Sequence, residues 1–244
     1  MKKIIISCLV TAMTMGSMAQ NVKIDPEAVL LLDRMSAVIG DLHSCSFTVK
    51  ASIDTVDKEL GLLKYFNTSE VSMVGPDKMQ VTTNGYRGHR GFWYNGKQLA
   101  YYSFTENNFG FIDAPGTIME TIEAVHEDYD IDFPAADFFF PYFTDDLIES
   151  SDVVSFLGKT FVDGRDCYHI AAKNKEMSVQ IWIADDAFNL PVKFAITYYR
   201  GDHSSQYEGS FSNWKLNPEL PNAMFEFTAP PGATQLTIIS KKGN

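Results

Sequence analysis

VQIWIADDAFNLPVKFAITYY, residues 179–199, contains two runs of alternating apolar and polar residues with a short polar connection between them. Such alternation predicts two half-buried strands. Asp185 and Asp186 supply turn residues, and Pro191 fixes φ where the second strand begins. The stretch predicts a β-hairpin with one apolar face, made of Val179, Ile181 and Ile183 on the first strand and Val192, Phe194, Ile196 and Tyr198 on the second.

Outward from this hairpin, alternating runs follow one another along most of the chain. Asn95-Gly96 is a strong signal for a two-residue hairpin turn, because both residues tolerate positive φ. No crossover helices separate these strands, so they are expected to form an antiparallel meander. A sheet of about ten or eleven strands with the normal twist must curl. The strand-like runs that contribute to this meander are 45–54, 61–67, 68–74, 78–84, 90–94, 98–104, 153–162, 165–172, 206–216, a short run 224–227 and a terminal edge run 233–239, besides the two of the hairpin.

Two segments have helical rather than strand-like spacing. Asp25-Pro26 places a capping side chain and then a proline at a helix start, and apolar residues recur at three- and four-residue steps as far as Leu42. The second segment spans about 115–151 and includes FPAADFFFPYFTDDLIES, residues 133–150, which is rich in aromatic residues and interrupted by two prolines. Because these aromatic side chains need burial, we expect the segment to form a helical lid that covers the concave face of the sheet with the first helix.

The first nineteen residues have the pattern of a secretory signal peptide. Lys2 and Lys3 precede an apolar run over 4–15, and Ser17-Met18-Ala19 is a small-x-small cleavage site. We expect cleavage after Ala19, export to the periplasm, and a single domain over residues 20–244. The mature chain contains no apolar run of membrane-spanning length.

Charge and cysteine content narrow the class of protein further. The formal net charge is −11, and loss of the two signal-peptide lysines makes it −13, which disfavours binding to nucleic acid. Cys45 and Cys167 remain in an oxidising compartment, where they form either one disulfide or two buried free thiols. The sequence leaves that alternative open.

No catalytic or metal-binding pattern emerges. No two of the five histidines have the spacing of a metal-binding pair. Asp128, Asp130 and Asp132 resemble the start of a calcium loop, but Phe133 stands where that loop requires a glycine. Cys167 and His169 share a strand face, but same-face neighbours lie about 6.5 Å apart, too far for direct contact. We therefore expect no cofactor, no metal site and no enzymatic activity.

Several stretches resemble known sequences. IDPEAVLLLDRMSAVIGDL, FPAADFFF, GRDCYHIAA, IWIADDAFNLPVKFAITY and FEFTAPPGA occur in this order and resemble a bacterial family of predicted periplasmic proteins, domain of unknown function 2092. The hairpin and the late PPGA are also similar to lipoprotein carriers of the LolA, LolB and LppX type. That resemblance implies a mainly β (α+β) half-barrel with helices across its concave face, enclosing a cavity for acyl chains. It implies no catalytic residue.

Apolar space between a sheet and a lid is a default site for an apolar ligand. The expected partner is therefore an apolar small molecule or a lipid, including lipoprotein acyl chains. The alternative is an envelope sensor or protein-interaction module on the same scaffold, with an envelope protein as partner. The residues expected to line the ligand site are Phe47, Val49, Ile53, Ile181, Phe194, Ile196, Met119, Ile122, Phe138, Phe139 and Phe140.

Overall fold

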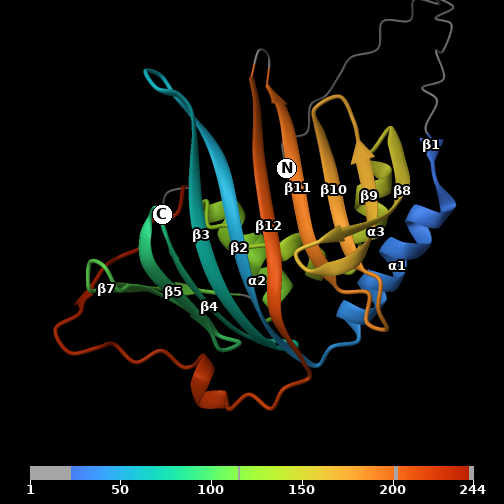
Figure 1. Ribbon diagram of the computed structural model, residues 1–244. Helices are drawn as coiled ribbons and strands as arrows, with labels where there is room; N and C mark the ends of the chain where they lie inside the picture. Colours follow the sequence, from blue (N-terminus) through green and yellow to red (C-terminus); the bar gives the residue numbers. More distant parts are fainter. Residues whose placement is uncertain (1–22, 115, 201–202, 242–244) are drawn as a thin grey trace, which may run out of the picture.

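The computed structural model describes residues 23–114, 116–200 and 203–241, so the expected signal peptide and its cleavage site lie outside the described residues. One open sheet dominates the described chain (Figure 1). Its strands are β1 (Lys23–Ile24), β2 (Ser44–Asp57), β3 (Gly61–Val74), β4 (Lys78–Gly85), β5 (Gly88–Tyr94), β6 (Gln98–Ser103), β7 (Asn108–Asp113), β8 (Val153–Val162), β9 (Arg165–Lys173), β10 (Met177–Ala184), β11 (Pro191–Arg200), β12 (His203–Leu216) and β13 (Thr234–Gln235).

The strand order is β1-β8-β9-β10-β11-β12-β2-β3-β4-β5-β6-β7-β13. Only the terminal pairs, β1 with β8 and β13 with β7, are parallel; the other neighbours are antiparallel. The prediction of a curved, mainly antiparallel sheet is confirmed. The predicted number of ten or eleven strands is wrong, because the sheet has 13 in the described residues.

The strands of the sheet also differ from the predicted runs at several places. The segments 61–67 and 68–74 form one strand, β3, whereas β7 and the two-residue β1 were not predicted. The expected strand 224–227 is instead part of the 3₁₀ helix η2 (Asn222–Phe225) and the extended residues after it. The expected edge strand 233–239 shortens to β13.

The hairpin of residues 179–199 forms as β10 and β11, with one deviation. The Asp186 carboxylate accepts hydrogen bonds from the backbone N–H groups of Phe188 (2.9 Å) and Asn189 (3.1 Å), which shapes the turn. Between Trp182 and Ile183 the register shifts, and Val192 is the extra residue. Its side chain consequently packs with Cys167 and Ala184, apart from Phe194, so its predicted face is wrong.

Helices cover one face of the sheet, called the inner face here, and the sheet curves around them (Figure 1). Asp25 caps the first helix, since its carboxylate accepts from the Glu27 N–H at 3.0 Å. None of the helices in the described ranges has both the length and the apolar character needed to cross a membrane. The helices are α1 (Pro26–Gly40), α2 (Ile118–Tyr129) and α3 (Phe143–Glu149), with the 3₁₀ helix η1 (Ala136–Phe139) between the last two.

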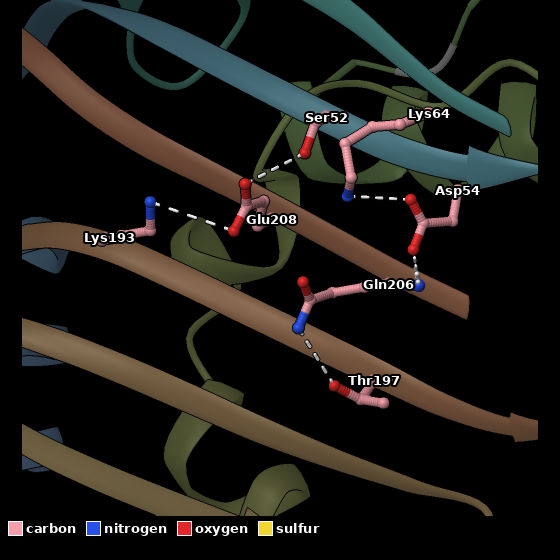
Figure 2. A network of polar contacts seen from close by, with 7 residues as sticks. All are labelled: Ser52, Asp54, Lys64, Lys193, Thr197, Gln206 and Glu208. Atoms are coloured by element: carbon pink, nitrogen blue, oxygen red, sulfur yellow. Dashed lines mark hydrogen bonds and ion pairs between the residues drawn. The ribbon is translucent and has the colours of Figure 1, made fainter. Parts of the chain in front are cut away.

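The opposite face, called the outer face, carries polar networks in the same strands (Figure 2). Asp54 is paired with Lys64 at 2.8 Å and accepts from the Gln206 backbone N–H at 3.0 Å. Glu208 accepts from the Ser52 hydroxyl at 3.1 Å and lies 3.9 Å from the Lys193 ammonium. These bonds join β2, β3, β11 and β12 across the face that the helices do not cover. Polar residues on this face and apolar residues on the inner face give the strands their alternating sequence.

Candidate ligand-binding cavity

A cavity of about 290 Å³ lies between the lid and three strands of the sheet. Residues from η1, α3 and the segment around them form one wall, and β10, β11 and β12 form the other. The volume is near the lower end of the roughly 300–1,000 Å³ typical of small-molecule sites. Its lining consists of Ala135, Asp137, Phe138, Phe140, Phe143, Asp146, Leu147, Ser150, Met177, Val179, Phe194, Ile196, Tyr198 and Tyr207.

Phe138 anchors the lid side of this cavity. Its ring stacks on Phe143 at 4.9 Å between centroids and lies 5.5 Å from Phe194 and 5.4 Å from Phe211. With 6% of its surface exposed, it belongs to the core as much as to the cavity. The lid is therefore held on the sheet by aromatic packing next to an unfilled space.

Phe194 forms the floor on the sheet side because a glycine lies beneath it. A Cβ atom on Gly209 of the neighbouring strand would lie 2.6 Å from the Phe194 ring. The missing side chain lets the ring lie close to the backbone of β12 and leaves the space above it open. Tyr207, two residues before Gly209, packs against Phe194 at 5.2 Å in an edge-on arrangement.

Polar groups occur at a few points of the lining. Asp137 and Asp146 are exposed, while Tyr198 and Tyr207 are half-buried. Although Asp137 as a whole residue is exposed, neighbouring atoms partly desolvate its carboxyl group; this desolvation, followed by the charge of Asp132, raises the pKa of that carboxyl above its usual value. Burial and then the charge of Asp137 raise the pKa of Tyr207 to about 12, so this phenol stays protonated at neutral pH and can donate a hydrogen bond.

The residues predicted to line a ligand site fall into several groups. Phe138, Phe140, Phe194 and Ile196 line the cavity, and Ile53 lines a different one. The other six are packed elsewhere on the inner face. Phe47, Ile122 and Phe139 surround a space of about 10 Å³, Val49 and Ile181 are buried in the core, and Met119 packs against it.

A second cavity of about 190 Å³ lies beyond Tyr207, which lines both cavities. Its polar lining includes Arg87 and Arg90 on the sheet side and Asp130 and Asp132 on the lid side. Such charged walls do not suit an alkyl chain. A larger hollow of about 490 Å³ lies on the outer face, away from the lid, and Asp152, Lys173 and Lys175 place charged groups around it.

The cysteine and histidine pair predicted to share a strand face does so, on the outer side. The Cys167 thiol donates to the backbone carbonyl of Arg165 at 3.6 Å, whereas His169 bonds Gln180 at 3.0 Å and stacks on Trp182. Burial raises the pKa of the Cys167 thiol, which is the opposite of what a nucleophile requires. Cys45 and Cys167 are both free and buried, in separate clusters.

Within the described ranges, no group of three or more His, Cys, Asp or Glu side chains is arranged to hold a metal ion. The acidic turn of Asp128, Asp130 and Asp132 has other partners. Asp132 pairs with His126 at 2.6 Å, and Asp130 pairs with Lys241. These contacts tie the end of α2 to neighbouring segments.

Comparison with solved structures shows similarity in fold. An uncharacterized conserved protein from Thermus thermophilus matches with a TM-score of 0.50 at 11% identity, over 86% of this chain and 99% of that one. Mycobacterium tuberculosis lipoprotein LppX matches with a TM-score of 0.50 at 15% identity, over 81% of this chain and 98% of the other. At such identities the likeness concerns the fold alone.

A third similar structure is the complex of MucA and MucB from Pseudomonas aeruginosa. Its TM-score is 0.45 at 9% identity, over 83% of this chain and 62% of that one, and no functional argument rests on it. The comparison with curated proteins found no match. A family model does match, over residues 28–239. The chain therefore belongs to the family described as "Predicted periplasmic protein (DUF2092)".

Proposed function

We propose that this protein is a non-catalytic periplasmic binding protein that holds an apolar ligand, such as one acyl chain of a lipid, between sheet and lid. The observation that carries the proposal is the cavity of about 290 Å³ with an apolar body made of Phe138, Phe140, Phe194 and Ile196. Protein interiors normally leave few voids larger than a water molecule, so an apolar space of this size suits a guest.

The fold supports the proposal in a second way. An open sheet that curves around helices can enlarge or reduce the space beneath its lid without unpairing strands. The lid is joined to the sheet mainly by ring contacts such as those of Phe138, which can separate and re-form more readily than a hydrogen-bonded ladder. The family description and the expected signal peptide support a periplasmic location.

Native mass spectrometry and solvent extraction of the purified protein test the proposal. We expect a co-purified apolar molecule, or saturable binding of the neutral dye Nile red to delipidated protein with a dye-to-protein ratio of one. Ile196→Asp introduces a charge on the cavity wall and should abolish the dye signal while circular dichroism stays unchanged. Ligand-free protein that gives no saturable dye signal would refute the proposal.

A second function, as a protein-interaction module, is favoured by the hairpin of β2 and β3. Its tip extends beyond the neighbouring strands, since β12 pairs with β2 only as far as Ile53. Val56, Leu60 and Leu62 near this tip are 54%, 73% and 51% exposed. Exposed apolar side chains on a projecting hairpin suit contact with an envelope protein.

Crosslinking in the periplasm from a photoreactive residue at position 60 tests this second function. A discrete crosslinked protein that disappears with Leu62→Ser would support it, and the same substitution should leave Nile red binding unchanged. A crosslinking pattern identical to that from an exposed position outside the tip, such as Glu219, would count against it.

A further inference from the structure

The charged residues of the cavity lie at its lid wall and have one sign. Asp137 on η1 and Asp146 on α3 are both exposed, and no lysine, arginine or histidine occurs among the described residues of the lining. The remaining polar groups are the Ser150 hydroxyl and the phenols of Tyr198 and Tyr207. An apolar chamber therefore opens toward two carboxylates.

Several described cations of the surrounding segments have other contacts or lie outside this cavity. Lys173 lies on the outer face, with its ammonium 5.6 Å from the centre of the Tyr199 ring. His126 is paired with Asp132 at 2.6 Å, and Arg87 and Arg90 line the second cavity, beyond Tyr207. No ion pair in the described part of the chain joins Asp137 or Asp146 to a cation.

Resting on the proposed function, we propose that the cavity selects a single-chain amphiphile whose head group donates hydrogen bonds and carries no negative charge, an alkylammonium most strongly. The alkyl chain would pack between Phe140, Phe194 and Ile196, and the head would lie near the two carboxylates. Ionised carboxylates only accept hydrogen bonds, so they pair with ammonium or hydroxyl donors. A fatty-acid carboxylate in the same position meets like charge, which opposes its binding.

Competition among ligands that have the same alkyl chain measures the effect of the head group on affinity. Dodecylamine, dodecanol and dodecanoate would each displace Nile red from delipidated protein at neutral pH and low salt, where the amine is charged and the acid ionised. We expect the amine to bind about tenfold more tightly than the alcohol, and the alcohol about tenfold more tightly than the carboxylate. Added salt should reduce the differences in affinity among the three ligands, because it screens exposed charges.

Paired substitutions test whether the two carboxylates cause this order. In Asp137→Asn with Asp146→Asn, the three affinities, each measured against Nile red bound to the same variant, should come to within about threefold of one another. The matched control is Glu59→Gln with Glu219→Gln, which changes net charge equally at exposed positions outside the cavity. The control should keep the parental order.

The outcomes distinguish this inference from the proposed function. If none of the three ligands displaces the dye, ligand binding in the cavity fails and the selectivity fails with it. If dodecanoate binds as tightly as dodecylamine, the binding function stands and the selectivity is refuted. Tight dodecanoate binding that is lost in Arg87→Gln with Arg90→Gln would place the head group in the second cavity instead. An amine preference that persists in the Asp137/Asp146 variant would reduce the effect to net charge and also refute it.

Discussion

At the scale of single residues, Gly209 controls the shape of the cavity floor. In Gly209→Ala the new Cβ would lie 2.6 Å from the Phe194 ring and 3.3 Å from the Val49 side chain. The ring must move into the space that it now borders, so we expect a loss of about 1–3 kcal/mol in the free energy of unfolding. Nile red binding should weaken in parallel. Urea titration and dye binding measure the two effects.

Gly40→Ala is the matched control for that substitution. A Cβ on Gly40, at the end of α1, would meet no atom within 4 Å. Its effect should stay within about 1 kcal/mol, in the stabilising direction, because alanine reduces the entropy of the unfolded chain. If both glycine variants behaved alike, the tight contact under Phe194 would have no energetic consequence.

The buried thiol of Cys45 predicts a pH dependence of stability. Burial raises its pKa from 9.0 to about 12, so the unfolded chain ionises first as the pH increases. The contribution of the protonated Cys45 thiol to the free energy of unfolding is fully present below pH 9.0 and is lost progressively toward pH 12. Cys45→Ala should therefore lose less stability than the parent over this interval. Denaturant titrations at successive pH values measure the difference, and parallel curves for the two proteins would contradict the prediction.

The sequence predicted some lining residues and not others, for a physical reason. Phe194 and Ile196 belong to an alternating run, whose inner face is visible in the sequence. Which inner-face residues border empty space depends on where the lid rests, and local periodicity contains no information about that. Met177 and Tyr207 were therefore missed, whereas Val49 and Ile181 were expected at the site and are packed in the core.

At the scale of elements, the three consecutive phenylalanines of the lid should behave differently. Phe138 is buried among three rings, and Phe138→Ala should cost about 3–5 kcal/mol in the free energy of unfolding. Phe140 is half-buried and borders the cavity, so Phe140→Ala should cost less stability and change dye affinity more. Thermal melts with and without Nile red separate the two effects.

Phe139 serves as the comparison for Phe140 within the same short segment. Its ring stacks on Phe47 at 5.3 Å, away from the cavity, so Phe139→Ala should lower stability without altering dye affinity. If Phe140→Ala also left dye affinity unchanged, the ligand would not occupy the space beside the lid.

The C-terminal strap, residues 217–241, protects one edge of the sheet. β13 pairs with β7, and the Leu236 N–H donates to the Phe109 carbonyl at 2.7 Å. A chain ending at Ala233 would uncover the backbone groups of β7, and open strand edges promote association. We expect concentration-dependent self-association in light scattering. A chain ending at Lys241 keeps these contacts and should remain like the parent.

Long alternating strands could be predicted from sequence, but the sheet edges could be predicted only in part. In β7, Phe109 and Ile112 face opposite sides of the sheet, and both are buried. Phe109 is buried on the outer face because the strap covers it with Phe227, whose ring centre lies 5.6 Å away. Burial on both faces removes the period-two pattern by which the other strands were recognised. The two-residue strand β1 is too short for any pattern and forms only through pairing with β8, whereas the predicted edge strand 233–239 exists only as β13, where Thr234 and Gln235 pair with β7.

At the scale of the whole molecule, cavity volume limits the class of lipid that can bind. About 290 Å³ under a lid packed by Phe138 suits one alkyl chain, while a second chain would require the lid to lift and break its ring contacts. A monoacylglycerol should therefore stabilise the protein more than the diacylglycerol that carries two copies of the same chain. A ligand at a hundredfold excess over its Kd adds about 2.7 kcal/mol, equivalent to a Tm increase of roughly 5–11 °C at this chain length. Thermal melts at matched, sub-micellar concentrations measure the difference. Equal stabilisation by the one-chain and two-chain lipids would mean that the lid opens at little energetic cost, and the cavity volume would then set no limit on the ligand.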